Sequence, residues 1–457
     1  MKELLRRHKV ELLIVAVVLA VVGPVVHEYR AQQASRYAMT AALWEEHTVV
    51  LNDYTQVLGI DRSVYAGHTY SDKAPGQPLL AVPFYAIYRT VGGQPGNVLQ
   101  IDENLGLWWL TLWSAMIPGA ALAALMYRSA LRTAPKAAIR ATLGMALGTI
   151  LLPFSALLFG HVLAALLGFA GFLVVSKEPS RVRLVAGGAL LGAAVTVEYT
   201  MVIVAFVLAA YLVWRAWKRV AWYVVGGAPF ALGLAMYNWS VFGNPLVLSY
   251  QLSAFSEVTD SARRITDVFS SLQPVRLLQV FFAPRGFLVA TPLVIVGLVG
   301  VVMMVRRRDL RAEGLVTAGV LLGFLLLPMM WGNPWGGDSP GPRYMLPALP
   351  FLALPAALAW RRLPLVSTVA AVVGVVTMGL ATFTDPLLPR EIGFGIVTWL
   401  GLAARGQWVP TLFTMWIGNW GWLFHAGLVI AAAVGLKLVT RPPTTDIVGV
   451  PNLSSVP

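Results

Sequence analysis

Long apolar runs recur along the whole chain, and short polar segments rich in arginine and lysine separate them. Runs of this kind can cross the hydrocarbon core of a bilayer, although some would be short or strongly tilted helices. The pattern predicts an all-α polytopic membrane protein with about twelve transmembrane helices. The runs lie at residues 11–26, 105–126, 141–158, 162–176, 184–199, 200–214, 220–241, 287–305, 314–331, 344–360, 365–382 and 420–436.

The composition supports this fold class. Of the 457 residues, 58% are hydrophobic and only 12% are charged, with a mean hydropathy of +0.71. Soluble domains of this size do not have such a balance. Sixteen tryptophans and fourteen tyrosines suit the aromatic belts at the two membrane–water interfaces. The absence of cysteine excludes a disulfide framework, a thiol nucleophile and a cysteine-ligated metal.

The basic residues predict the orientation in the membrane. The net charge is +13, but the bases form short clusters between alternate pairs of apolar runs, so nucleic acid is not an expected partner. The positive-inside rule places these clusters, and with them both termini, in the cytoplasm. We therefore expect a multi-pass protein of the cytoplasmic (inner) membrane. The clusters are Lys2/Arg6/Arg7/Lys9, Arg128/Arg132/Lys136/Arg140, Lys177/Arg181/Arg183, Arg215/Lys218/Arg219, Arg306/Arg307/Arg308/Arg311, Arg361/Arg362 and Lys437/Arg441.

Three long segments face the extracytoplasmic side in this topology, at residues 27–104, 242–286 and 383–419. Long non-spanning segments that share one face usually carry the function. We expect residues 1–441 to form a single transmembrane domain. The Pro/Ser/Thr-rich tail, residues 442–457, is typical of a disordered segment and would lie in the cytoplasm.

The first of these segments contains the most informative stretch of the chain. Residues 68–78 read His-Thr-Tyr-Ser-Asp-Lys-Ala-Pro-Gly-Gln-Pro, so that Asp72 and Lys73 are adjacent in a turn rich in proline and glycine. Charge near a bilayer is costly, and its presence there favours a functional site. The alternative interpretation is a solvated loop with an incidental ion pair. On either side, residues 34–46 and 78–91 have the amphipathic spacing of helices that lie in the membrane interface.

Further polar and aromatic residues gather at the outer ends of the predicted helices. Lysine and arginine can neutralise a phosphate, a carboxylate can accept a proton from an attacking hydroxyl, and tryptophan can stack on sugar rings. For each residue alone, a structural role is as good an interpretation or a better one, but their convergence on one face favours a site for a lipid-linked phosphate. The candidates are Glu45, Asp53, His68, Tyr70, His161, Glu198, Tyr199, Arg285, Trp335, Asp338 and Arg343.

Several common catalytic motifs do not occur in the sequence. There is no GxxxxGK[ST] motif, which argues against an ATP-driven pump. There is no HExxH motif, no cluster with zinc-ligand spacing and no GxSxG nucleophile elbow. The remaining hypothesis is chemistry on a phosphate-linked substrate at the outer membrane surface.

Three parts of the sequence resemble the GT-C superfamily of membrane glycosyltransferases, which use polyprenyl-phosphate sugars as donors. Residues 35–43 followed by 68–78 are similar to the first loop of protein O-mannosyltransferase-like and lipid A aminoarabinose transferase-like enzymes. In that loop an Arg-Tyr-Ala segment precedes an acid-Lys-Pro-Pro turn. Phe-Gly-His at 159–161 with Glu-Tyr-Thr at 198–200 is the second part. Residues 335–351, which include Trp-Gly-Gly-Asp and Gly-Pro-Arg-Tyr, are the third.

The resemblance implies roles for individual residues. Asp72 matches an acid at the catalytic or metal site, and Lys73 matches a lysine that contacts the donor phosphate. Arg36 and Tyr37 match the segment that follows the first catalytic acid of the family. Together with Arg285 and Arg343, the cations Lys73 and Arg36 are the candidate phosphate ligands.

The chain departs from the family pattern at one point. An acidic pair usually precedes the Arg-Tyr of the first loop, whereas residues 32–35 here are Gln-Gln-Ala-Ser. The usual general base is therefore missing from its usual place. Asp72 and Asp53 are the alternatives for that role, with Glu45 as a third choice, and the same departure leaves metal binding open.

The function that the resemblance implies is an inverting glycosyl transfer on the extracytoplasmic face. The donor would be a polyprenyl-phosphate sugar, the acceptor a glycan, lipid or protein of the cell envelope, and a divalent cation such as Mg²⁺ or Mn²⁺ a candidate cofactor. Two alternatives stay open. A transporter or flippase of lipid-linked saccharides would need polar residues at mid-depth of several helices. A catalytically degenerate relative would only bind lipid-linked sugar or act as a scaffold.

Overall fold

A helix lies at each of the twelve apolar runs in the computed structural model. Among the residues it describes, five helices are long and apolar enough to cross a membrane, and a sixth crossing forms if the bent pair Val275–Ala290 and Leu293–Arg306 is one span. The expected number of twelve crossings is therefore not confirmed and stays a prediction. The described residues are 2–96, 104–178, 180–253, 271–331, 334–389 and 391–440.

One apolar stretch is too long to be a single crossing. Tyr199–Phe242 comprises 44 residues, and a straight helix of that length would be roughly twice as long as the ~30 Å hydrocarbon core. The chain leaves the helical conformation at Ala216, where φ is −156° and ψ is 50°. This break separates α11 (Val202–Ala216) from α12 (Val220–Phe242), as the two separate apolar runs predict.

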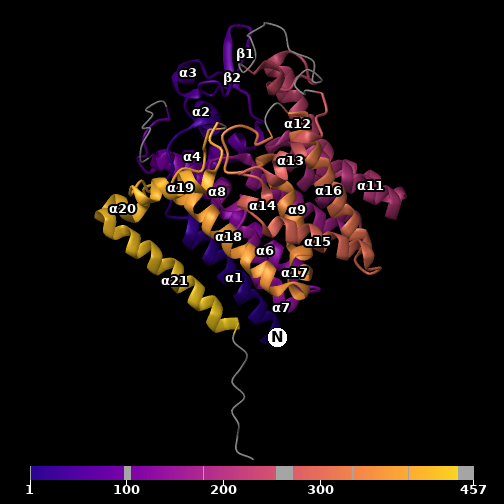
Figure 1. Cartoon of the computed structure of the whole chain (residues 1–457). Helices are drawn as coiled ribbons and strands as arrows, with labels where there is room; N and C mark the ends of the chain where they lie inside the picture. Colours follow the sequence, from indigo (N-terminus) through magenta and orange to yellow (C-terminus); the bar gives the residue numbers. More distant parts are fainter. Residues whose placement is uncertain are drawn as a thin grey trace, which may run out of the picture.

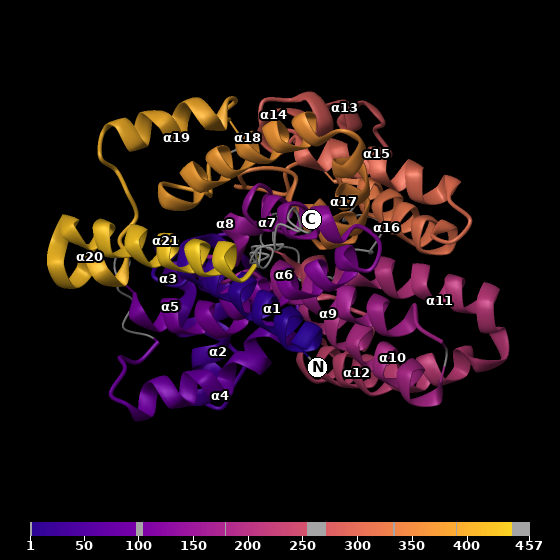
Figure 2. The same cartoon turned by 90° about the horizontal axis from the view of Figure 1, so that it is seen from below.

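The remaining helices form a bundle around α1 and α6. Figure 2 shows these two helices in the middle of the view from below, with α10, α11 and α12 on one side and α19, α20 and α21 on the other. The bounds are α1 (Lys2–Val22), α5 (Leu105–Thr111), η2 (Leu112–Met116), α6 (Ile117–Leu131), α7 (Pro135–Leu147), α8 (Leu151–Ser155), α9 (Gly160–Val175), α10 (Arg181–Val197), η3 (Tyr199–Met201), η4 (Trp217–Arg219), α13 (Val275–Phe282), α14 (Phe287–Ala290), α15 (Leu293–Arg306), α16 (Arg311–Met330), η7 (Arg343–Leu352), α17 (Ala353–Arg362), α18 (Pro364–Phe383), α19 (Gly395–Ala404), α20 (Leu412–Ile417), η8 (Gly418–Trp420) and α21 (Gly421–Thr440).

Glycines set the distance between α10 and α12. A Cβ atom on Gly188 would lie 1.9 Å from the carbonyl oxygen of Tyr223, and one on Gly226 would lie 2.0 Å from that of Val185. Only a residue without a side chain permits this approach. Small residues at such crossings are typical of transmembrane helices, because apolar side chains gain little by leaving lipid for another helix.

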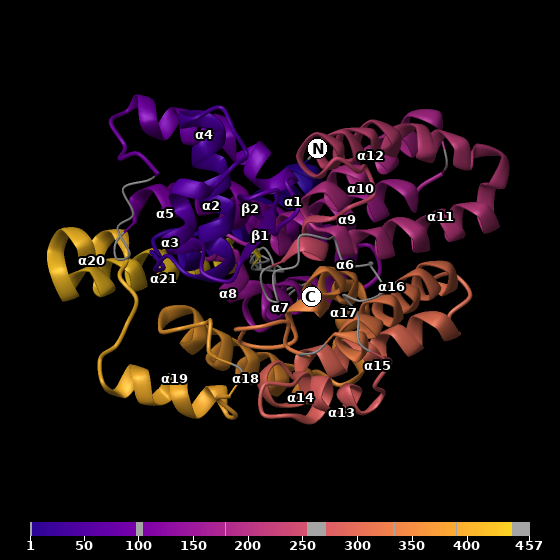
Figure 3. The same cartoon turned by 90° about the horizontal axis from the view of Figure 1, so that it is seen from above.

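The first long segment forms a cap at one end of the bundle. Helices form over both of its amphipathic stretches, and Figure 3 shows the cap from above. In Figure 1 the cap lies at the top, whereas the start of α1 and the end of α21 both lie at the opposite end. The cap contains α2 (Ala31–Glu45), η1 (Asn52–Tyr54), α3 (Thr55–Leu58), β1 (Arg62–Tyr65), β2 (His68–Ser71) and α4 (Gly76–Thr90).

A two-stranded antiparallel hairpin is the element that the all-α prediction lacked. Arg62 of β1 pairs with Ser71 of β2, and the strands are joined through Ala66 and Gly67. Both linking residues have positive φ, 49° and 76°, which is the geometry of a type I′ hairpin turn. The usual Asn-Gly or Asp-Gly signal is Ala-Gly here, so the local sequence does not predict the turn.

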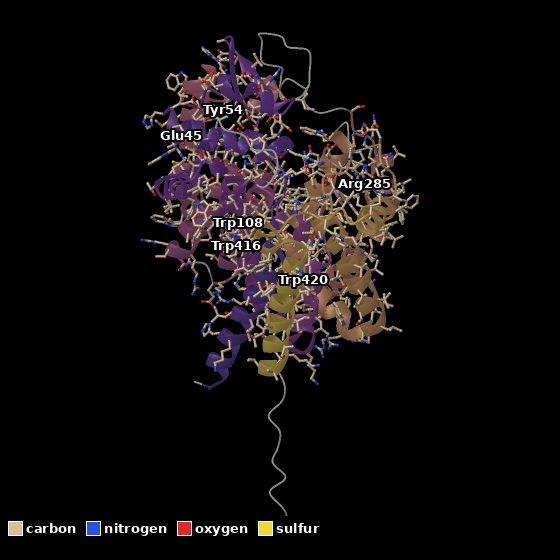
Figure 4. All side chains as sticks on the ribbon, turned by 90° about the vertical axis from the view of Figure 1, so that its left-hand side faces the viewer. Glu45, Tyr54, Trp108, Arg285, Trp416 and Trp420 are labelled. Atoms are coloured by element: carbon tan, nitrogen blue, oxygen red, sulfur yellow. The ribbon has the colours of Figure 1, made fainter. Side chains whose placement is uncertain are left out.

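Aromatic residues mark the surface near the upper end of α21. Trp416 and Trp420, labelled in Figure 4, are 84% and 71% exposed. Exposed tryptophans of this kind suit a membrane–water interface.

The single-domain assignment of residues 1–441 and the cytoplasmic side of the termini stay predictions, and the tail at 442–457 lies outside the described residues.

Candidate functional site

Asp72 and Lys73 lie between β2 and α4, and both side chains are buried. Their exposed fractions are 0% and 2%, so the alternative of a solvated loop is wrong. The Lys73 ammonium donates a hydrogen bond to Asp72 Oδ2 and another to Asp61 Oδ1, each at 2.8 Å. It also lies 5.3 Å from the ring centroid of Tyr250. Lys73 is therefore held between two carboxylates and beneath an aromatic ring.

Hydrogen bonds from three parts of the chain fix this turn. Ser71 Oγ, at the end of β2, lies 2.8 Å from Ser35 Oγ on α2 and accepts from the backbone N–H of Lys73 at 3.2 Å. Ser249 Oγ, more than 170 residues away in sequence, donates to the carbonyl oxygen of Asp72 at 3.0 Å. The site is thus built by tertiary contacts and not by the turn alone.

The local electrostatics keep Asp72 ionised at neutral pH. Burial raises the pKa of Asp72 to about 6, the nearby Asp61 carboxylate adds to the rise, and Lys73 opposes both effects. Burial by itself would lower the pKa of Lys73, but the attraction of Asp72, Tyr250 and Asp61 outweighs it and raises that pKa. Asp72 Oδ1 has no hydrogen-bond partner among the described residues, so this oxygen can accept a proton.

A second buried cluster joins Arg36, Glu198 and His161. Arg36 Nη2 donates to Glu198 Oε1 at 2.5 Å, and His161 Nδ1 lies 3.0 Å from the same oxygen. All three side chains are at most 8% exposed. A Cβ atom on Gly160 would lie 2.6 Å from Glu198 Oε1 and 2.9 Å from Arg36 Nη1. The Phe-Gly-His sequence therefore needs its glycine to let the ion pair approach α9.

Arg343 is a buried cation with uncharged partners. It is 8% exposed, and its guanidinium carbon lies 5.7 Å and 5.8 Å from the ring centroids of Phe159 and Tyr344. With its amide oxygen turned toward the guanidinium, Gln32 accepts a hydrogen bond from Arg343 Nη2 at 2.6 Å. In the part of the chain that the structure describes, no carboxylate lies within ion-pair distance of Arg343.

The sequence around Arg343 folds back onto its own guanidinium. Gly336 and Gly337 have φ values of 83° and 111°, a region that favours glycine. A Cβ atom on Gly336 would lie 2.9 Å from Arg343 Nε. The Trp-Gly-Gly-Asp stretch therefore needs glycine both for the turn itself and for the contact with the arginine.

Arg285 is buried in a different environment. It is 1% exposed and lies 5.5 Å from the ring centroid of Trp335. Its guanidinium holds together the segments before α14, before η7 and after α18. It donates to three main-chain carbonyl oxygens, those of Ser339 at 2.8 Å, Leu388 at 3.1 Å and Pro389 at 3.1 Å.

The other two candidate bases lie in settings unlike that of Asp72. Glu45 forms an ion pair with Arg89 and accepts a hydrogen bond from Tyr85 at 2.9 Å. Asp53 is exposed on the short η1 turn. Figure 4 shows Glu45 and Arg285 on opposite sides of that view. Of the three carboxylates, Asp72 is the one next to the predicted cation.

The candidate substrate contacts divide into buried and exposed groups. Tyr199 lies near the Asp72 turn, with its hydroxyl 3.4 Å from Ser249 Oγ. The structure leaves the role of each residue a prediction. Tyr37 is buried in α2 against Tyr29 and Tyr85, Tyr70 packs on Phe242, Trp335 packs on Arg285, and His68 and Asp338 are exposed.

Three residues of the site were not selected from the sequence. Asp61 is one of several acids in the first segment, and nothing in the local pattern singles it out. Ser249 and Tyr250 belong to η5 (Ser249–Leu252), which Ser63 of the hairpin anchors by donating to the carbonyl oxygen of Ser249 at 2.7 Å. Because this contact joins distant segments, spacing along the sequence could not reveal it.

The described residues do not fit a divalent metal ion. Among them, no group of three or more His, Asp or Glu side chains could hold one. The ammonium of Lys73 lies between the Asp72 and Asp61 carboxylates, 2.8 Å from an oxygen of each. Mg²⁺ and Mn²⁺ prefer oxygen ligands that no other cation neutralises.

Comparison with known proteins shows the fold. No family model and no curated protein matches the sequence. The oligosaccharyltransferase AglB from Archaeoglobus fulgidus, in complex with an inhibitory peptide and a dolichol-phosphate, has a TM-score of 0.52 at 12% identity, covering 95% of this chain and 56% of that chain. Its apo form has a TM-score of 0.51 at 13% identity, with coverages of 94% and 56%.

A bacterial structure is also similar. ArnT from Cupriavidus metallidurans bound to undecaprenyl phosphate is 14% identical, covers 94% of this chain and 75% of that chain, and has a TM-score of 0.49. The chain spans just over half the length of the archaeal enzyme. These proteins are GT-C superfamily glycosyltransferases. The resemblance inferred from the sequence is thus confirmed at the level of the fold.

Proposed function

We propose that this protein is a membrane glycosyltransferase that takes its sugar from a polyprenyl-phosphate donor and acts at the extracytoplasmic surface. The observation that carries the proposal is the buried Arg343 guanidinium, whose described partners are an amide and aromatic rings. A buried charge is costly unless it is paired, so an anion such as the donor phosphate would complete the site. The dolichol-phosphate in the AglB structure supports a lipid phosphate as the ligand of this fold.

The charges of the site favour Arg343 over the other candidate phosphate ligands. Arg36 is neutralised by Glu198, and Lys73 is more than neutralised by Asp72 and Asp61, since that trio carries a net charge of −1 when both acids are ionised. Arg285 already donates to three main-chain carbonyl oxygens. A phosphate would therefore bind most favourably at Arg343, and Lys73 would act mainly by orienting Asp72.

Asp72 is the proposed general base. Its free Oδ1 would take the proton of the acceptor hydroxyl, while the hydroxyl oxygen forms a bond to the sugar C1. The bond between C1 and the phosphate oxygen breaks, and its electron pair leaves with the lipid phosphate, which Arg343 stabilises. Attack on the face opposite the leaving group inverts the configuration at C1. No step passes through a metal ion, because the described side chains do not fit one.

The test is sugar transfer by the purified full-length protein in nanodiscs. The donors would be radiolabelled polyprenyl-phosphate sugars, and membrane lipid and glycan extracts would serve as acceptors. We expect product with the unaltered protein, a loss of about 100-fold or more in Arg343→Ala, and partial activity in Arg343→Lys. Arg307→Ala, on the exposed surface, is the matched control and should leave the rate unchanged.

The same assay separates the alternatives. A transporter or flippase would move the lipid-linked sugar across the nanodisc or liposome membrane without forming a product, and a degenerate scaffold would do neither. Full activity of a folded Arg343→Ala protein would remove the proposed phosphate site. Thermal unfolding of each variant shows whether the loss of activity reflects the loss of the fold.

A further inference from the structure

A cavity of about 270 Å³ lies next to the first turn of α2, where Gln33 is one of its lining residues. It opens between the α1–α2 connection and the segments that precede and follow α19. A neighbouring cavity of about 690 Å³ shares four lining residues with it, Glu28, Trp408, Val409 and Pro410. Volumes of this order are typical of small-molecule sites. Neither the Asp72 turn nor Arg343 lines either cavity.

Main-chain hydrogen bonds hold the walls of the cavity together. The backbone N–H of Val26 donates to the carbonyl oxygen of Pro410 at 2.9 Å, and that of Leu412 donates to Pro24 at 2.8 Å. The backbone N–H of Val409 donates to the carbonyl oxygen of Phe383 at 3.0 Å. Segments from opposite ends of the chain thus form one preorganised wall, which lowers the cost of ordering on binding.

The polar lining suits a hydroxylated and uncharged ligand. Arg30 forms ion pairs with Glu28 at 2.7 Å and with Asp385 at 2.9 Å, so the three side chains carry a net charge of −1, which disfavours a phosphate. Carboxylate oxygens fixed in this way accept hydrogen bonds from sugar hydroxyls. His27, another lining residue, is 7% exposed, and its Nε2 has no hydrogen-bond partner in the described part of the chain.

Aromatic rings complete the lining. Trp408 lines both cavities and is 42% exposed, and its ring centroid lies 5.9 Å from that of Trp422, which lines the larger cavity. Aromatic faces beside hydrogen-bonding carboxylates match the two surfaces of a sugar, whose C–H faces are apolar and whose edges carry hydroxyls.

We propose that this cavity binds a neutral saccharide, and that this saccharide is a part of the acceptor away from the reacting hydroxyl, because Asp72 does not line the cavity. The assignment as acceptor rests on the proposed function, whereas saccharide binding itself does not. Consecutive residues on the first turn of α2 separate the two sites. Gln32 faces Arg343, while Gln33 lines the cavity and accepts a hydrogen bond from the backbone N–H of Leu158 at 3.0 Å.

The arrangement sorts the two substrates by charge. A phosphate-bearing donor would favour the cationic Arg343 side, and a neutral acceptor would favour the weakly acidic side that contains Glu28 and Asp385. The acceptor class is therefore a glycan or the glycan part of a lipid. A peptide is less suitable, because its recognition does not require an exposed tryptophan beside carboxylates that bind hydroxyl groups.

The experiment is saturation-transfer NMR on the purified full-length protein in nanodiscs. The probes are the methyl glycosides of glucose, mannose, galactose and arabinose with their disaccharides, and inorganic phosphate and an uncharged tripeptide serve as competitors. We expect transfer to the ring C–H protons of at least one sugar, and at least a fivefold loss of affinity in Trp408→Ala and in Glu28→Gln. Trp416→Ala removes a more exposed tryptophan outside the cavity lining and is the matched control.

Three outcomes would overturn the proposal: no sugar binds, Trp408→Ala binds as well as the unaltered protein, or phosphate or the tripeptide displaces the sugar. The Arg343→Ala protein distinguishes the two proposals. This variant should still bind the saccharide but should no longer transfer sugar. If it does both, the donor phosphate site at Arg343 is contradicted, and the saccharide site is not. Loss of binding in Trp408→Ala with unchanged transfer would contradict the acceptor role of the cavity.

Discussion

Arg36 and Glu198 are 162 positions apart in the sequence, yet their side chains form an ion pair with 2.5 Å between Nη2 and Oε1. Both are almost fully buried. The pair joins α2 of the cap to the end of α10 in the bundle, and the imidazole of His161 contacts the same carboxylate oxygen. The cap is therefore tied to the bundle by an ion pair that is almost fully buried.

Glu198→Gln should strongly destabilise the protein. The substitution leaves the Arg36 guanidinium buried without its counter-charge, and breaking a buried pair in this way costs about 3–5 kcal/mol. Thermal unfolding of the purified protein in detergent, followed by circular dichroism, would show a clearly lowered midpoint. The double variant Arg36→Met with Glu198→Leu should be more stable than Glu198→Gln, because it leaves no unpaired charge.

Asp309→Asn is the matched control for this substitution. Asp309 pairs with Arg307 at 2.6 Å, but both side chains are highly exposed, and such surface pairs contribute little. We expect an unchanged unfolding midpoint. Equal midpoints for Glu198→Gln and Asp309→Asn would contradict the structural role of the buried pair.

Gly160→Ala tests the approach of this ion pair to α9. The added methyl group would lie 2.6 Å from Glu198 Oε1, so the pair or the helix must move, at a cost of about 1–3 kcal/mol. Gly379→Ala in α18 is the control, since a Cβ atom there meets nothing within 4 Å and alanine favours a helix. The Gly160 variant should unfold at a lower temperature than the Gly379 variant, and the reverse order would show that the packing at Gly160 is relaxed.

Lys73→Met should make stability depend strongly on pH. Without the ammonium, nothing offsets the burial of Asp72 and its repulsion by the nearby Asp61, so the pKa of Asp72 rises further in the folded protein. A carboxyl whose pKa is raised on folding stabilises the folded state when protonated, and that stabilisation is lost as pH rises. The unfolding midpoint of Lys73→Met should therefore increase as pH falls from 8 to 5.

The unaltered protein should show a weaker trend, because Lys73 neutralises part of that charge. Lys136→Met, at an exposed position in the first turn of α7, controls for the loss of one positive charge. Similar pH trends for the two methionine variants would mean that Lys73 does not hold the two carboxylates together.

The twelve helical positions and the amphipathic helices α2 and α4 could be predicted because periodic hydrophobicity is a local property. The adjacent charges of Asp72 and Lys73 were identifiable for a similar reason, since charge stands out in an apolar chain. The hairpin could not be predicted, because Ala66 stands where Asn or Asp usually signals a type I′ turn. The break at Ala216 could also be predicted, because the basic cluster Arg215/Lys218/Arg219 interrupts the apolar stretch there.

The partners of the site could not be predicted from the sequence. Glu198 is a candidate on sequence grounds, but only the fold shows that its partner is Arg36. Asp61 and Ser249 reach the Asp72 turn through contacts between distant segments, and the glutamine that replaces an expected acid, Gln32, turns out to face Arg343. Such pairings depend on tertiary packing between distant segments, and local patterns along a single sequence do not show which segments will meet.

The proposed base predicts the pH dependence of the transfer reaction. Burial raises the pKa of Asp72 to about 6, and only the ionised carboxylate can accept the hydroxyl proton. We expect kcat/KM to be constant above about pH 7 and to fall roughly tenfold per pH unit well below pH 6. The measurement is the initial rate of transfer in nanodiscs between pH 4.5 and 8.5. Returning each sample to pH 7.5 and measuring its activity again shows whether any protein has been irreversibly inactivated.

Variants separate Asp72 from the other acids of the cap. Asp72→Asn should remove transfer at every pH while donor binding at Arg343 persists, since the amide keeps the shape of the side chain but has no basic oxygen. Asp53→Asn changes an exposed carboxylate on η1. It should keep the transfer rate and also the fall of kcat/KM at low pH, which we call the acidic limb. If Asp53→Asn lost the limb and Asp72→Asn kept it, the base would be Asp53, and the buried Lys73–Asp72 pair would have a structural role.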